Sequence, residues 1–169
     1  SIGMIDLHLH FDGSLLPRTI LELAEEQGIS LPARDPDELK LFLTAPKDCR
    51  SLNEYLEKFD LPLLVLQTRE AIRRGMYTLL CSLKEQGMLY AEVRFAPQSH
   101  LKKGLTQEEV VKAAVLGMQE AAAGSFFKAQ LILCCMRGAD NQEANRKTIE
   151  TAAAFLGRGV AAVDLAGAE

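Results

Sequence analysis

Segments with a strand-like pattern alternate with helix-like segments along most of this chain, and this alternation limits its fold more than any other feature. Period-two or wholly apolar runs predict strands at residues 4–10, 88–95, 126–134 and 159–165. Apolar residues at helical spacing predict helices at residues 17–28, 68–86, 110–123 and 141–156. Strands that alternate regularly with helices favour a parallel sheet with right-handed crossovers.

Two α/β architectures fit this order: a doubly wound open sheet and part of a (β/α) barrel. An eight-unit barrel takes ~250 residues, whereas this chain has 169 residues and four predicted strands. The barrel interpretation makes residues 1–169 a single partial domain, the N-terminal half (strands 1–4) of a (β/α)8 TIM barrel. The long first crossover, residues 11–87, is then a helical insertion that covers the carboxyl ends of the strands as a lid.

Composition narrows the functional class. The net charge is −4 and the chain has no basic run, which argues against a nucleic-acid surface. No segment approaches the roughly 20 consecutive apolar residues of a membrane span, and no secretory signal opens the chain. The four cysteines form no C-x-x-C pair. We therefore expect a cytoplasmic protein that binds neither nucleic acid nor membrane and acts on small molecules.

The first predicted strand carries the residues with the clearest chemistry. Polar and apolar residues alternate strictly along residues 4–10, so His8 and His10 share one face of the strand with Asp6. Their spacing lets two imidazole nitrogens approach one divalent ion at ~2.1 Å each. They also lie at the carboxyl end of the strand, where α/β folds place their sites. Taken alone, the pair also fits two histidines with purely structural contacts.

The sequence around this pair is similar to that of the adenosine deaminase family of the amidohydrolase superfamily. Four later segments also resemble the family, and they occur in the same order. The resemblance covers essentially the whole chain. The segments that carry it are DLHLHFDGSLLP at Asp6–Pro17, YLEKFD at Tyr55–Asp60, YAEVRFAP at Tyr90–Pro97, ILCCMR at Ile132–Arg137 and VAAVDLAGAE at Val160–Glu169.

The resemblance implies a role for several residues. His8 and His10 would be ligands of one Zn²⁺ ion, and His10 would also lie against the nucleoside. Asp12 would contact a ribose hydroxyl, and the backbone of Gly167 would contact the purine ring. Phe59 would line the lid over the base with Leu56 and Leu61. Where the family often has an acidic residue after the glycine, this chain has Ala168, which leaves the role of that carboxylate in doubt.

The activity that the resemblance implies is zinc-dependent hydrolytic deamination of adenosine, and of 2′-deoxyadenosine, to inosine and ammonia in purine salvage. In the family, a glutamate acid, a histidine base, a third zinc histidine and a metal-side aspartate come from later strands. None of these later motifs occurs in the chain. We therefore expect the acid and the base beyond residue 169, no catalytic residue in this chain, and no activity of this chain without the remaining half of the barrel.

Two alternatives stay open at this point. A related amidohydrolase that acts on adenine or on a modified purine nucleoside would share the same metal strand, although Asp12 and the lid favour a nucleoside. A self-contained, non-catalytic α/β domain that binds metal or a partner would need no further strands. Such a four-strand sheet would, however, leave its last strand as an unprotected edge.

Other polar residues are expected to have structural roles. Glu92 and Arg94 share one strand face and predict a buried ion pair. Asp164 predicts a structural hydrogen bond, and His100 predicts an exposed loop residue. Cysteines 134 and 135 predict packing rather than metal ligation. Three arginines on one helix predict a solvated basic face: Arg69, Arg73 and Arg74.

Overall fold

The computed structural model describes residues 4–44 and 61–166. The strands are β1 (Met4–His10), β2 (Met88–Phe95), β3 (Lys128–Met136) and β4 (Val160–Ala166). The helices are α1 (Phe11–Ser14), α2 (Pro17–Gln27), α3 (Pro36–Thr44), α5 (Arg69–Glu85), α6 (Gln107–Ala122) and α7 (Gln142–Phe155), with 3₁₀ turns η1 (Pro97–His100) and η2 (Ala139–Asn141). Residues 61–65 are also helical.

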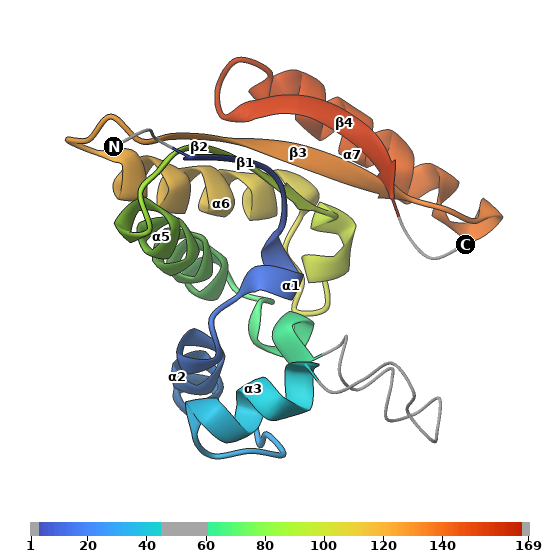
Figure 1. Cartoon of the computed structure of the whole chain (residues 1–169). Coiled ribbons are helices and arrows are strands. Elements are labelled where there is room, and N and C mark those ends of the chain that lie inside the picture. The colour runs from blue at the N-terminus through green and yellow to red at the C-terminus, as the bar shows by residue number, and fades with distance from the viewer. Residues whose placement is uncertain (1–3, 45–60, 167–169) are drawn as a thin grey trace.

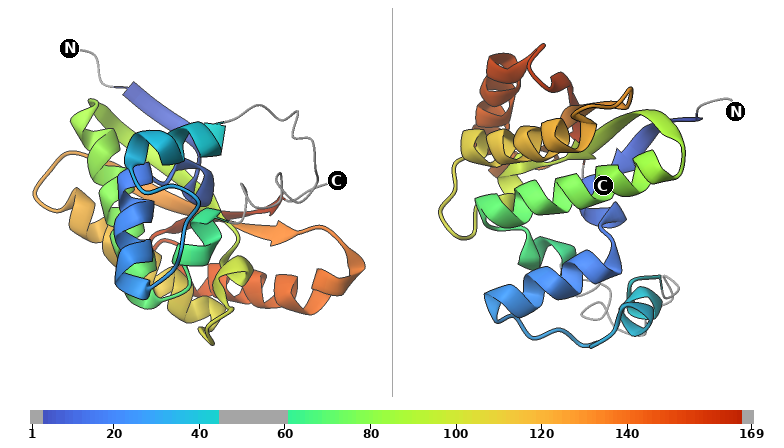
Figure 2. Two further views of the ribbon diagram at one scale, coloured as in Figure 1. Left: turned by 90° about the horizontal axis from the view of Figure 1, so that it is seen from below. Right: turned by 90° about the vertical axis from the view of Figure 1, so that its left-hand side faces the viewer.

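All pairings in the described sheet are parallel, and its strand order is β1-β2-β3-β4. Sheet order therefore follows chain order, as the β/α alternation predicts for one side of a barrel. In Figure 1, α5 and α6 lie together under the sheet, and α7 runs beside β4. Both figures show α2 and α3 away from the sheet, beyond the carboxyl end of β1 (Figures 1 and 2).

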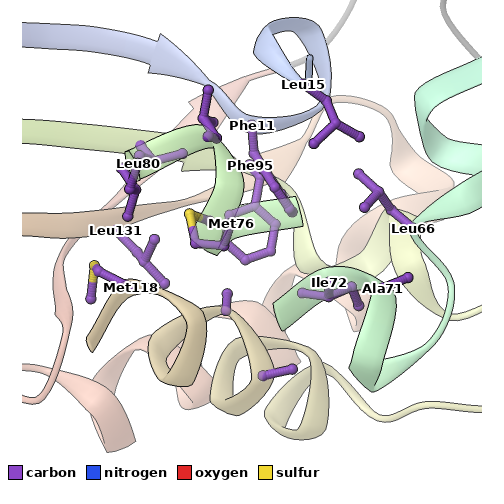
Figure 3. Packing of buried hydrophobic residues seen from close by; sticks show 14 of the residues in the cluster. Phe11, Leu15, Leu66, Ala71, Ile72, Met76, Leu80, Phe95, Met118 and Leu131 are labelled. Carbon is purple, nitrogen blue, oxygen red and sulfur yellow. The ribbon is translucent and has the colours of Figure 1, made fainter. Parts of the chain in front are cut away.

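The core lies between the sheet and its helices. Along β2, Ala91, Val93 and Phe95 are buried, while the residues between them are half-buried. This period-two pattern turns one face of the strand towards the helices. Figure 3 shows Met76 of α5 beside Phe95, and Leu131 of β3 beside Met118 of α6, in this layer. The apolar run of β3 is buried throughout residues 131–135, as expected for a strand with neighbours on both sides.

Local capping sets where the crossover helices begin. The Thr68 hydroxyl accepts the Ala71 N–H at the start of α5. Thr106 and Glu109 form a complete capping box at the start of α6, which confirms the interpretation of that sequence. Because both helices begin at the end of the sheet where β1 and β2 finish, these caps also set the lengths of the loops around that end.

The arginines of α5 lie on a partly exposed face, as predicted, and they also have acidic partners that the prediction lacked. Arg73 pairs with Glu70 on its own helix and with Glu120 of α6, and Arg74 pairs with Glu26 of α2 at 2.6 Å. The pattern of one helix cannot show acidic residues on its neighbours. The basic face is therefore also a set of ion pairs that joins α5 to α2 and α6.

Helices α5 and α6 approach most closely at Gly117. A Cβ atom added there would lie 2.2 Å from the backbone carbonyl oxygen of Arg73, which cannot move without distorting α5. We expect Gly117→Ala to destabilise the protein by about 1–3 kcal/mol, since overpacking outweighs the better helix propensity of alanine. Urea denaturation would measure this loss.

The matched control is Gly75→Ala in α5. The nearest atoms to a Cβ at Gly75 are the side-chain ends of Leu66 and Leu15, at 3.1 and 3.2 Å. Side chains of this kind can shift, so the loss should be smaller than at Gly117. An unfolding midpoint for Gly117→Ala at or above that of the unaltered protein would contradict the close helix contact.

No helix within residues 4–44 and 61–166 combines the length and the apolar character needed to cross a lipid bilayer.

Candidate metal and nucleoside site

The predicted site begins where β1 ends. His10 is the last residue of β1 and the N-cap of α1, and its side chain is exposed. Asp12 lies in the first turn of α1 and is half-buried. Between them, Phe11 is completely buried. One buried ring therefore anchors a turn that presents an imidazole and a carboxylate on either side of it at the carboxyl edge of the sheet.

His8 lies two residues before His10 within β1. The pairing of β1 with β2 shifts register between Asp6 and Leu9, so the ladder is less regular there than strict alternation predicts. Irregularities of this kind are common beside active sites, where they redirect a side chain. The structure describes the backbone of His8 but not its ring, so the shared face of the two imidazoles stays a prediction.

Three other predicted contacts lie outside the described residues: Gly167, Phe59 and Leu56. Leu61, the remaining residue predicted for the lid, is described and is buried at the start of the helical residues 61–65. Leu61 packs into the core, and the lid over the base stays a prediction.

The donor set can be compared with what zinc needs. A catalytic zinc normally has three protein ligands and an open position. The described parts of the chain contain no group of three histidine, cysteine or acidic residues arranged to hold a metal ion. His8 and His10 are of the right chemical type and spacing for two of the ligands, so these residues fit part of a zinc site and leave the rest to be supplied from elsewhere.

His100 differs from its expectation as an exposed loop residue. Its side chain is 1% exposed, and its Nδ1 atom lies 2.6 Å from the carbonyl oxygen of Leu66. Its ring stacks on Phe11 and meets Phe95 edge-on, with centroids 6.2 and 5.6 Å apart. Burial lowers the pKa of His100 from its ordinary value. The polar sequence of this loop predicts exposed side chains. Turn η1 nevertheless directs the His100 ring inward.

The predicted ion pair between Glu92 and Arg94 is also wrong. Glu92 accepts a hydrogen bond from the Tyr90 hydroxyl at 2.9 Å, and Arg94 forms its ion pair with Asp164 of β4. The long arginine reaches across β3 to a strand whose proximity only the folded sheet reveals. The Arg94 hydrogen bond lowers the pKa of Asp164. The structural hydrogen bond predicted for Asp164 is confirmed.

The two cysteines at the end of β3 pack in the interior. Cys134 and Cys135 are 3% and 6% exposed. Burial raises the pKa of Cys134 to about 11, so its thiol stays protonated near neutral pH and is a poor metal ligand. The expectation of packing agrees with both observations.

A partly buried polar network that the sequence pattern does not reveal supports the same edge of the sheet. Asn145 of α7 accepts the Met136 N–H at 2.8 Å and donates to the Met136 carbonyl at 2.7 Å. Gln98 of η1 donates to Asn145 at 2.8 Å, while Gln107 of α6 accepts from Thr148 at 2.6 Å. These amides fasten the loops after β2 and β3 to the helices behind them. The sequence does contain amide residues after β2 and β3, which could have suggested such a network. It does not show their partners, which are distant in sequence.

Comparison with known proteins gives one consistent family. The family model described as adenosine deaminase matches residues 4–169. The adenosine deaminase of Haemophilus ducreyi is 51% identical over 171 residues, which cover 99% of this chain and 50% of the relative. That of Clostridium perfringens is 40% identical over 169 residues, which cover 100% of this chain and 51% of the relative.

Solved structures agree on the fold. Adenine deaminase from Arthrobacter aurescens superposes with a TM-score of 0.76 at 26% identity and covers 100% of this chain and 50% of its own. An Arabidopsis N6-mAMP deaminase gives 0.77 at 24% identity, over 99% of this chain and 51% of its own. A Burkholderia ambifaria amidohydrolase with bound Zn gives 0.78 at 20%, over 99% of this chain and 45% of its own.

The chain spans about half the length of the curated relatives it matches. Its four parallel strands correspond to half of the TIM barrel of its structural neighbours, which confirms the predicted fold class. The family model extends over all the strands, and the relatives align with nearly the whole chain. The chain belongs to the adenosine deaminase family.

Proposed function

We propose that this chain is the metal-binding half of a zinc-dependent adenosine deaminase. Together with the later strands that its relatives have, it would form a complete barrel that deaminates adenosine and 2′-deoxyadenosine to inosine and ammonia in cytoplasmic purine salvage. The observation that carries the proposal is the α1 turn, in which buried Phe11 presents His10 and Asp12 at the carboxyl end of β1 of a chain from this family.

Each residue of the site has a proposed role. His8 and His10 would hold the zinc ion, which supplies an activated water near neutral pH when bound. His10 and Asp12 would orient the nucleoside, with Asp12 accepting a hydrogen bond from a ribose hydroxyl. Gly167 would contact the purine through its backbone, and Phe59 would close over the base. The acid and base that move protons would come from beyond residue 169.

The completed barrel is itself part of the proposal. Val163 and Leu165 of β4 are 38% and 50% exposed, and Ile149 and Leu156, in and directly after α7, are 55% and 62% exposed. Apolar side chains gathered at the last strand of the described sheet are what a following β/α unit would cover. Residues 11–87 would be the helical insertion of this barrel, and α2 and α3 would form the part that stands over the site as its lid.

A free base is the second candidate substrate, because one structural neighbour is named adenine deaminase. The substrates differ in the ribose, and Asp12 is the residue proposed to contact it. A nucleoside deaminase therefore depends on Asp12, whereas an enzyme for free adenine has no hydroxyl for this carboxylate to hold.

The experiment is a substrate comparison on the complete barrel with zinc. We expect adenosine to be deaminated with a higher kcat/KM than adenine. Asp12→Ala should reduce kcat/KM for adenosine by about 10- to 100-fold, as expected for one charge-assisted hydrogen bond. Adenine, which has no ribose, serves as the internal control, and its turnover should change little. Faster turnover of adenine than of adenosine by the unaltered enzyme would overturn the nucleoside assignment.

A further inference from the structure

Helix α1 meets the end of β2 and the turn η1 at one buried ring, although α1 is distant from both in sequence. His100, at the end of η1, stacks on Phe11 of α1 with an interplanar angle of 27° and meets Phe95 of β2 at 77°. The rings of Phe11 and Phe95 also meet edge-on, 5.6 Å apart. The three rings therefore form one cluster directly below the turn that carries His10 and Asp12. Movement of any member would be transmitted to that turn, since a packed interior has little free volume.

The same ring is also hydrogen-bonded to Leu66, which lies in residues 61–67 just before α5. His100 Nδ1 lies 2.6 Å from the Leu66 carbonyl oxygen. A carbonyl oxygen can only accept, so Nδ1 carries the hydrogen and donates it. Because burial lowers the pKa of His100, the ring is neutral near pH 7 and acts as a fixed hydrogen-bond donor.

A neighbouring amide ties the same two segments together. Gln67 donates to the carbonyl oxygens of Leu63 and Ser99 at 2.9 and 3.0 Å, and it accepts the Lys102 N–H at 2.9 Å. Gln67 is 2% exposed. The hydrogen bonds between η1 and residues 61–67 therefore involve two buried side chains, Gln67 and His100, and His100 also touches Phe11 of α1.

We propose that His100 is a positioning residue: its hydrogen bond to Leu66 and its stacking on Phe11 hold the α1 turn, and with it His10 and Asp12, in place against residues 61–67. This inference rests on the proposed function and adds a residue that touches neither substrate nor metal. Its effect on the site passes through Phe11, the residue between the two polar groups.

A purely structural role makes a different prediction. A histidine that only fills the core would lower the amount of folded enzyme when it is replaced, and kcat calculated on total protein would fall. KM does not depend on the concentration of active enzyme, so it would not change. A positioning role changes the geometry of Asp12 in every folded molecule and therefore raises KM.

Two substitutions in the complete barrel with zinc separate the hydrogen bond of His100 to Leu66 from the stacking of its ring on Phe11. His100→Phe keeps an aromatic ring but removes the donor to Leu66. His100→Asn retains an N–H close to the position of Nδ1, although it loses the ring. We expect His100→Phe to raise KM for adenosine about tenfold, because small misplacements at a site can cost up to about a hundredfold. His100→Asn keeps the donor but loses the stacking on Phe11 through which the effect passes, so its KM should also rise, by about threefold, which is less than in His100→Phe.

The control for lost stability is Met118→Ala. Met118 is a buried α6 residue that lies beside Leu131 and apart from the α1 turn (Figure 3). The Met118→Ala substitution should lower the unfolding temperature of the protein and leave its KM for adenosine unchanged. If His100→Phe does not accumulate as folded protein, His100→Leu replaces it, since leucine is smaller and also lacks the donor.

A zinc readout keeps this test independent of the proposed activity. Competition with a chelator should show zinc bound about tenfold more weakly in His100→Phe than in the unaltered protein or Met118→Ala, because His10 is held by the same turn. If the unaltered barrel binds zinc but deaminates no purine, the proposed function fails and the zinc comparison still decides the role of His100. An unchanged KM and zinc affinity in His100→Phe, or changes of equal size in Met118→Ala, would overturn the positioning role.

Discussion

Replacing His8 by alanine in the complete barrel is expected to remove zinc and deaminase activity together. The proposed site has few protein ligands, and a catalytic zinc usually has three. Loss of a partner that only orients a ligand typically costs 10- to 100-fold in metal affinity or activity, so loss of a ligand itself should cost at least about a thousandfold. Elemental analysis and adenosine turnover on the same preparation would test both effects at once.

The control for this experiment is Lys103→Ala, an exposed position in the loop after η1. It should retain one zinc per chain and full activity. A His8→Ala protein that retains stoichiometric zinc would remove His8 from the ligand set, whatever its activity. Loss of zinc without loss of activity would contradict the metal-dependent reaction instead.

The second large effect is expected for the 169-residue chain when it is assayed by itself. It should show no measurable deamination of adenosine, with or without added zinc. A general acid and a general base typically contribute 10²- to 10⁴-fold each, and the chain is proposed to contain neither. Its turnover should therefore be at least about 10⁴-fold below that of the complete barrel.

Ammonia release measured side by side for the two proteins would make this comparison. Intact mass of each preparation confirms which polypeptide is assayed, and the complete barrel is the positive control. Zinc-dependent turnover by the 169-residue chain alone would show that a sufficient set of catalytic groups lies within it, and would contradict the assignment of the acid and base to later strands.

The elements of the fold follow from local pattern. The predicted strand at 88–95 matches β2, and the capping box starts α6. Both features depend on residues within a few positions of one another. The third strand was predicted two residues early because Phe126 extends its apolar run. That ring is 93% exposed, and the strand begins at Lys128. An apolar residue at a strand's end does not show by itself whether it is buried.

The site was predicted less completely, for a physical reason. His10 and Asp12 are neighbours in sequence, and their placement follows from the end of β1. The partner of Arg94 is 70 residues away in Asp164, and the partner of His100 is 34 residues away at Leu66. Long side chains and inward-turned loops choose partners only after the sheet has formed. Period and spacing within one segment contain no information about them.

The strand order has a consequence for how this protein is made. Each of β2, β3 and β4 pairs with the strand synthesised immediately before it. When a new strand leaves the ribosome, its neighbour is already present, so the sheet can grow one β/α unit at a time during translation. The first pairing should be the slowest, because Met4 of β1 pairs with Met88 of β2 across the long insertion and long-range parallel pairing is intrinsically slow. The four strands can therefore join the sheet in the order in which they are synthesised.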